Sequence, residues 1–183
     1  MSPLIIILGA IVLIGIFIWS LYNGLVTLNA QVDEAWSQID VQLKRRTDLI
    51  PNIVASVKGY AKHEKEVFEN VTKARSALMK AESPTSMAKA DNQLSGALKS
   101  LFAVAESYPQ LRANENFVQL QKELSDTEDK IAYSRQFYNS TVMDLNVKIR
   151  LFPNSIIANM LSFKERDFFK TEGGDRNAVK VQF

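Results

Sequence analysis

Several residue types that enzymes rely on are scarce or absent. The chain has 183 residues, no cysteine and a single histidine, His63. Without cysteine it can form no disulfide, thiolate nucleophile or thiolate metal site, and one histidine cannot supply the imidazole pair of a common zinc site. Neither a glycine-rich phosphate loop nor a nucleophile-elbow signature occurs. We therefore expect no catalytic activity, cofactor, metal or small-molecule substrate.

Charge is nearly balanced, with 22 Lys and Arg against 20 Asp and Glu. A net charge of +2 gives no bulk attraction to nucleic acid or to acidic partners. We therefore predict no nucleic-acid binding. The acidic run Glu123, Asp126, Glu128 and Asp129 lies beside Lys122 and Lys130, which predicts an exposed, charge-paired helix flank rather than a cation site.

Charge is missing altogether from the first part of the chain, where no charged residue precedes Asp33. From Leu4 to Leu21 nearly every residue is aliphatic or aromatic. At about 1.5 Å per residue, a helix from Pro3 to Tyr22 matches a bilayer core of about 30 Å. We predict a transmembrane anchor over residues 1–24, with Trp19 and Tyr22 at the membrane interface.

Two other interpretations of this run fit the sequence less well. A core helix of a soluble protein is usually amphipathic, whereas this run is apolar on every face. A cleaved signal sequence would have basic residues before the run and a small-x-small site after it, and neither is present. An uncleaved anchor in the lipid bilayer is therefore favoured.

The orientation of the anchor has fewer indicators. The first basic residues are Lys44, Arg45 and Arg46, beyond the window in which the positive-inside rule is most reliable. A short uncharged N-terminal tail is easily translocated. We expect the N-terminus outside and the rest of the chain in the cytoplasm.

Beyond the anchor, apolar residues recur at helical spacing. Leu25, Leu28, Val32, Ala35, Ile39 and Leu43 form one stripe, which predicts that the anchor helix continues into the first domain helix. Pro51 lacks an amide hydrogen and predicts a kink or restart. The stripe then resumes in phase at Ile50 and extends through Tyr60 and Val67 to Leu78, so we expect one kinked or briefly interrupted helical arm.

Three further helices are predicted. One starts near Ser86 and ends at Tyr108–Pro109; the next is capped by Asn114 and carries a heptad stripe from Phe117 to Phe152; a short one covers 154–161. The fold class is therefore all-α, an N-terminal transmembrane helix continuing into an elongated antiparallel three- to four-helix bundle over residues 25–170. Residues 171–183 are predicted to be a flexible tail.

The sequence offers a candidate partner surface rather than an active site. Its members are Arg45, Arg46, Asp48, Pro51, His63, Phe168 and Phe169. For the charged members the competing interpretation is a solvated helix face with a local ion pair. For Phe163, Phe168 and Phe169 it is burial at the end of the bundle, and an enzyme using Asp48, His63 or Glu64 is a further alternative.

Two blocks of the sequence carry a family resemblance. They comprise Asp48-Leu49-Ile50-Pro51-Asn52, Gly59-Tyr60-Ala61-Lys62-His63-Glu64 and Ala74-Arg75, followed by Tyr108-Pro109, Asn114 to Phe117, Leu120-Gln121, Thr127-Glu128, Arg135, Tyr138-Asn139, Asn146 and Phe152-Pro153. Together with the ending Val179 to Phe183, they resemble the LemA family of bacterial membrane proteins. The resemblance implies a single-pass anchor with a helical bundle in the bacterial inner membrane, and it implies no reaction.

The functional prediction is a membrane-anchored helical scaffold or adaptor. It would act by self-assembly or by docking a membrane-protein partner. The alternative is an accessory subunit of an envelope-stress or membrane-protein quality-control machine.

Overall fold

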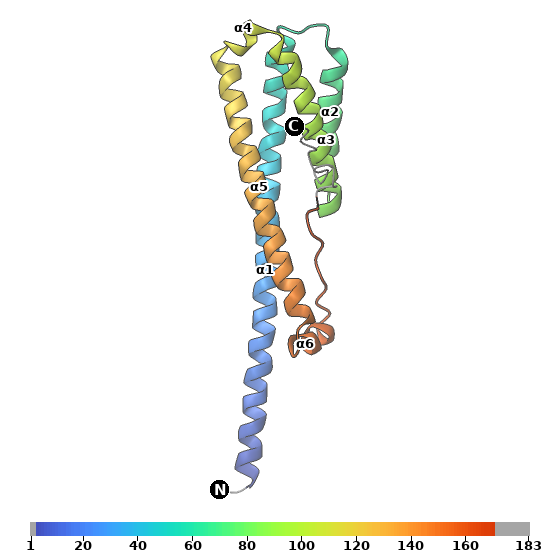
Figure 1. Ribbon diagram of the computed structural model, residues 1–183. Coiled ribbons are helices and arrows are strands. Elements are labelled where there is room, and N and C mark those ends of the chain that lie inside the picture. Colours follow the sequence, from blue (N-terminus) through green and yellow to red (C-terminus); the bar gives the residue numbers. More distant parts are fainter. Residues whose placement is uncertain (1–2, 171–183) are drawn as a thin grey trace, which may run out of the picture. The chain divides into compact units, whose positions relative to one another are not determined.

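The protein is all-α, as predicted. The computed structural model describes residues 3–170. Its helices are α1 (Pro3–Lys58), α2 (Lys65–Met79), α3 (Pro84–Glu106), α4 (Pro109–Arg112), α5 (Glu115–Arg150) and α6 (Asn154–Met160) (Figure 1). The tail predicted over residues 171–183 lies outside the described residues.

The chain divides into two compact units, and α1 and α5 contribute to both. Unit 1 is Met1–Asp40 with Tyr133–Asp167, and unit 2 is Val41–Ala132 with Phe168–Phe183. The predicted boundary at residue 24 falls inside unit 1. The division into anchor, bundle and tail therefore stays a prediction.

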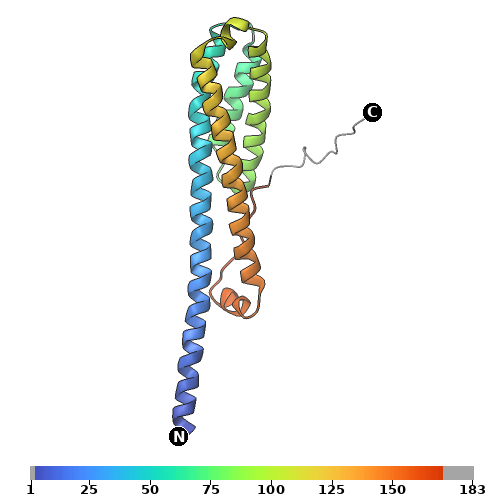
Figure 2. The same ribbon diagram turned by 60° about the vertical axis from the view of Figure 1, so that its left-hand side comes forward.

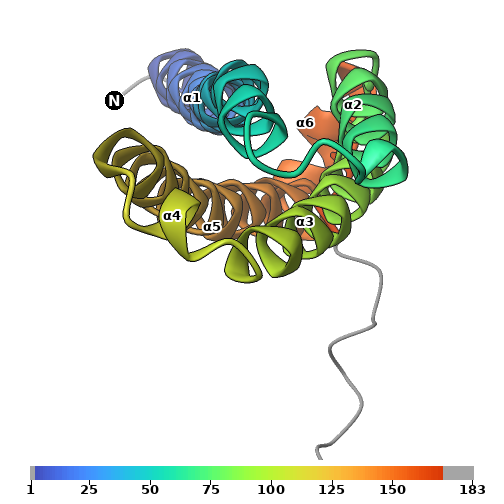
Figure 3. The same ribbon diagram turned by 90° about the horizontal axis from the view of Figure 1, so that it is seen from above.

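Unit 2 is an antiparallel bundle of the last part of α1, α2, α3 and the first part of α5. Seen end-on, α3 lies between α2 and α5 (Figure 3). The bundle encloses buried apolar side chains from all four helices, among them Leu43, Ile50, Ile53, Val57, Phe68, Val71, Leu78, Leu94, Leu98, Leu101, Phe117 and Leu124. Except for Phe68, these residues lie at the predicted helical spacing, because one stripe per helix is enough to fill a shared core. Val67, which was predicted in place of Phe68, is only half-buried.

Unit 1 consists of the first part of α1 against the end of α5 and α6. The two long helices run side by side in this unit (Figure 2). Val32, Ala35 and Ile39 of α1 are buried, as are Val142 and Leu145 of α5. The ring of Trp36 on α1 is half-buried and lies 5.4 Å from that of Tyr138 on α5.

Of the kink or restart predicted at Pro51, the restart does not occur, because α1 continues through this residue to Lys58. Proline cannot donate to the carbonyl four residues back, here that of Thr47. Arg75 of α2 donates to this carbonyl instead, with Nε 2.7 Å from the oxygen. The proline ring itself is exposed. A side chain from the neighbouring helix thus satisfies the acceptor that proline leaves free.

The single arm predicted from Ile50 to Leu78 is wrong. The helix ends at Lys58, and a turn over residues 59–64 reverses the chain into α2. The amides of Gly59 and Ala61 bond the carbonyls of Ala55 and Val57, and Ala61 is fully buried. Tyr60 and Val67 are seven residues apart, which matches two turns of a helix. This spacing does not distinguish a continuous helix from a helix followed by a turn, so the sequence did not reveal the reversal.

The other predicted helix ends are confirmed. Ser83 caps α3 through a capping box with Ser86, and Asn114 Oδ1 accepts from the amide of Phe117 at 3.2 Å at the start of α5. α3 ends at Glu106, just before Tyr108–Pro109.

A double-mutant cycle tests the contact between Pro51 and Arg75. Arg75→Met should lower the free energy of unfolding by about 1.5 to 3 kcal/mol, because the Thr47 carbonyl then loses its charged hydrogen-bond donor. In a Pro51→Ala background the restored amide of residue 51 can donate to the Thr47 carbonyl, so Arg75→Met should cost about 1 kcal/mol less.

Urea denaturation of the full chain in detergent measures both costs. The matched control is Lys73→Met, an exposed lysine of α2, which should change the free energy of unfolding by less than about 0.5 kcal/mol. Equal costs of Arg75→Met in the two backgrounds would contradict this account of how the helix continues through Pro51.

Candidate functional site

The first functional feature is the N-terminal part of α1. Its most apolar 18-residue window is long enough to cross a membrane, and none of that window is buried. Trp19 and Tyr22 are exposed, and Leu25 is the first fully buried side chain. A core helix of a soluble protein would be buried along this length. The described residues contain one such helix, in agreement with the predicted anchor.

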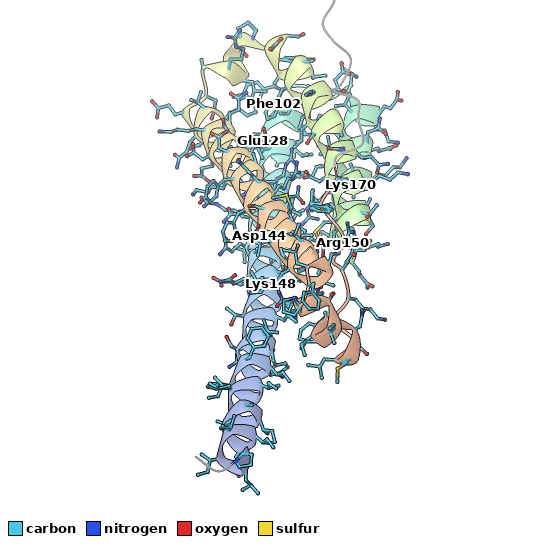
Figure 4. All side chains as sticks on the ribbon, turned by 60° about the horizontal axis from the view of Figure 1, so that its bottom comes forward. Phe102, Glu128, Asp144, Lys148, Arg150 and Lys170 are labelled. Carbon is cyan, nitrogen blue, oxygen red and sulfur yellow. The ribbon has the colours of Figure 1, made fainter. Side chains whose placement is uncertain are left out.

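The end of α5 and the residues after α6 meet α1 just beyond this apolar run. The ring of Phe163 stands edge-on to Tyr22, with centroids 6.5 Å apart. The Lys148 ammonium lies over Gly24: a Cβ atom placed on that glycine would be 2.7 Å from Nζ. Figure 4 shows Lys148 and Arg150 on this last part of α5. Aromatic and cationic groups therefore gather where the exposed apolar run ends.

The second feature is a buried ion cluster in unit 2, centred on Arg46 of α1. The Arg46 side chain is 2% exposed. Its Nη1 donates to Asp91 of α3, and its Nη2 donates to Glu128 of α5 at 2.8 Å and to Ser95 at 2.9 Å. One guanidinium thus joins three helices, because its planar fork can donate in several directions.

The electrostatics of this cluster favour a structural role. Burial lowers the pKa of Arg46, and the facing Glu128 carboxylate raises it in part. Arginine nevertheless remains protonated at any physiological pH. Asp91 is 1% exposed, whereas Glu128 is 51% exposed, so the pair with Asp91 is the one removed from water. Such a pair is costly to break, because removal of one partner leaves a buried charge.

The predicted partner surface is only partly available. Arg46 is buried, and its ion pairs are with other helices rather than with a local residue of its own helix, so both interpretations were wrong for it. Phe169 is also buried, as the competing interpretation held, and Phe168 is half-buried.

The other members of that surface remain exposed. Arg45, Asp48 and Pro51 lie on α1, and His63 lies in the turn before α2. The structure therefore separates this group into buried and exposed members, and the partner role of the exposed ones stays a prediction.

A third feature holds the extended segment after α6 to unit 1. Arg166 Nη2 donates to Asp33 at 2.7 Å and to Asn29 at 3.1 Å on α1. The side-chain amide of Asn146 on α5 accepts from the Arg166 amide and donates to its carbonyl, both at 2.9 Å. The Tyr138 hydroxyl donates to the Asp167 carbonyl, and burial raises its pKa.

A surface ion pair closes the loop that contains α6. Arg150 Nε donates to Glu165 at 2.7 Å, and Nη2 donates to the second carboxylate oxygen. These bonds lower the pKa of Glu165 and raise that of Arg150. Because the pKa of the folded-state carboxylate is lowered, the contribution of this pair to stability is present at neutral pH and lost as the pH falls through that pKa.

Sequence reasoning missed a basic groove in unit 2. Lys58, Lys62, Lys65 and Lys73 surround Val54 and Phe68 on α1 and α2, with Glu69 and Thr72 completing the lining. Lys65 is 3.7 Å from Glu69, and both are exposed. The sequence spreads these lysines over α1, the turn at residues 59–64 and α2, so their grouping depends on that turn. In the described part of the chain, no group of His, Cys, Asp and Glu is arranged to hold a metal ion.

The buried ion cluster can be tested with a neighbouring arginine as the control. Arg46→Met should lower the free energy of unfolding by about 3 to 5 kcal/mol, because the buried Asp91 carboxylate then loses the Arg46 guanidinium. Arg45→Met changes an exposed side chain next to it and should cost less than about 0.5 kcal/mol.

Chemical denaturation of both full-length variants in the same detergent measures the difference. A cost of Arg46→Met that is no larger than that of Arg45→Met would contradict a structural role for the cluster.

Comparison with known proteins places the chain in a family. It is 25% identical over 88% of its length to Magnetosome protein MamQ 2 of Paramagnetospirillum magneticum, covering 69% of that protein. It is 29% identical over 84% of its length to Protein LemA of Metamycoplasma hominis, covering 71% of that protein. The sequence model of the LemA family matches residues 35–183. The chain therefore belongs to the LemA family.

Proposed function

We propose that this protein is a membrane-anchored helical scaffold or adaptor without catalytic activity. One observation carries the proposal: the exposed apolar run and the buried stripe that follows it belong to one uninterrupted helix, α1. A tether needs only a flexible link to its domain, whereas a continuous helix transmits the position and tilt of the anchor to what packs on it. Such a helix suits a protein that positions partners at a membrane.

The groups described above support a positional role rather than a chemical one. The polar interactions of Arg46 and Arg166 join helices or fix the chain after α6. Exposed positions on unit 2, including the basic groove on α1 and α2, are available to bind a partner. The proposed partners are copies of the chain itself or another membrane protein.

For location, we propose the bacterial inner membrane with the N-terminus outside and the bundle in the cytoplasm. The family and the single candidate span support a single-pass membrane protein. The MamQ relatives are named for the magnetosome, and that association is theirs.

A single-cysteine variant tests location and assembly in one preparation. The chain has no cysteine, so Ser125→Cys on the exposed face of α5 introduces one label site with a nearly isosteric change. A membrane-impermeant maleimide should label it only after the cells are permeabilised. Labelling in intact spheroplasts would place the bundle on the outer side.

The same protein, crosslinked in the native membrane and then extracted in mild detergent, should have the mass of a homo-oligomer or of a defined complex with a membrane protein. A strictly monomeric chain with no crosslinked partner would contradict the scaffold function. A complex with a membrane protease would instead favour the alternative, an accessory role in quality control.

A further inference from the structure

The loop that contains α6 exposes an unusual amount of apolar surface. Residues 151–163 contain no charged side chain, and Arg150 and Lys164 flank them. The exposed apolar members are Leu151, Phe152, Ile156, Met160 and Leu161, with Phe152 at 80% and Met160 at 75%. Single exposed apolar residues are ordinary, but a contiguous group of this kind marks an interaction site.

This exposure is built into the folded loop. Ile157 and Ala158 are buried, so one face of α6 is packed inside the protein. Ile156 and Met160 are four residues apart and therefore share the opposite face. The backbone bonds from Ser155 to Leu151 and from Phe163 to Ala158 are 2.8 and 2.9 Å long. The apolar face is therefore held outward by a packed and hydrogen-bonded segment.

The loop lies at one particular level of α1. Phe163, at its end, contacts Tyr22, and the Lys148 ammonium just before it lies over Gly24. From Pro3 to Tyr22 is about 29 Å of helix, close to the thickness of a bilayer core of about 30 Å. α1 extends past α6 toward its N-terminal end in both side views (Figures 1 and 2). The loop therefore stands beside α1 where the proposed span leaves the hydrocarbon.

We propose that Phe152, Ile156, Met160 and Leu161 enter the lipid interface of the leaflet from which α1 emerges, so that the α6 loop is a second membrane contact of this chain. The inference rests on the proposed anchoring by α1. The apolar face of an interfacial helix lies at the boundary between head groups and acyl chains, with the polar groups toward water. Lys148 and Lys164, on either side of the loop, can extend their ammonium groups to lipid phosphates.

Continuity with the span favours lipid over a second copy of the chain as the occupant. The bilayer already surrounds α1 up to Tyr22, so a protein partner on the loop would have to displace lipid at the same level. A second contact beside the helix axis also has a consequence for the scaffold. It prevents α1 from turning freely about its axis and fixes which side of unit 1 faces the membrane.

Site-directed spin labelling of the full chain in lipid nanodiscs tests this contact. The cysteine-free chain accepts single labels at Phe152→Cys and Met160→Cys, both highly exposed positions. Ile11→Cys in the span reports the bilayer core, and Ser125→Cys on unit 2 reports water. We expect labels at 152 and 160 to resemble the label at 11, with collisions favouring dissolved oxygen over a polar nickel chelate, and the label at 125 to show the reverse.

Three results would overturn the proposal, and they differ from one another. If 152 and 160 resemble 125 while 11 resembles lipid, the loop faces water and the anchor stands. If 152 and 160 are shielded from both reagents, protein covers the loop. If the label at 11 itself reports water, the anchoring by α1 fails and the loop contact fails with it.

Discussion

Helix α1 must satisfy two solvents along its length, and the rest of the fold follows from this constraint. Its first part is apolar on every face and stays exposed, whereas from Leu25 onward its buried apolar side chains follow one stripe and Val26 and Val41 outside that stripe are exposed. An all-round apolar surface needs lipid, and a single stripe needs other helices. The chain supplies them through α5 in unit 1 and through α2, α3 and α5 in unit 2.

Polar groups then define which helices meet. In unit 2 Arg46 joins α1, α3 and α5, and Arg75 satisfies the carbonyl that Pro51 leaves free. In unit 1 Arg166 holds the segment after α6 against α1 and α5. A buried ion pair adds little net stability compared with an apolar contact, but a mispaired arrangement would leave a charge buried without its partner. These contacts therefore select one arrangement of helices within each unit.

Several residues that carry the family resemblance have structural tasks here. Arg75 donates to the Thr47 carbonyl that Pro51 leaves without an amide donor. Tyr138 donates to the carbonyl of Asp167, and Asn146 donates to the carbonyl of Arg166. These contacts account for how a chain without disulfides holds a long loop and a proline-containing helix in place.

The sequence predicted the helices well because the apolar stripes and caps are local signals. It failed at residues 59–64, where the chain reverses although the spacing of Tyr60 and Val67 matches that of a continuous helix. It also could not identify the partners of Arg46, because Asp91 and Glu128 lie 45 and 82 residues away. Burial of an arginine depends on helices that local spacing does not locate. The membrane contact proposed for the α6 loop likewise depends on the contacts of Phe163 with Tyr22 and of Lys148 with Gly24, which the sequence alone does not bring together.

The central claim is that the anchor and the first packed helix are one rigid element. Nitroxide labels at Ile11→Cys and Ser37→Cys, both exposed positions of α1 within unit 1, test it directly in lipid nanodiscs. An unbroken helix predicts one narrow distance distribution near 39 Å by pulsed electron resonance, from about 1.5 Å per residue. A broad distribution, or a shorter separation from a bend near Gly24, would contradict the account and reduce the anchor to a flexible tether.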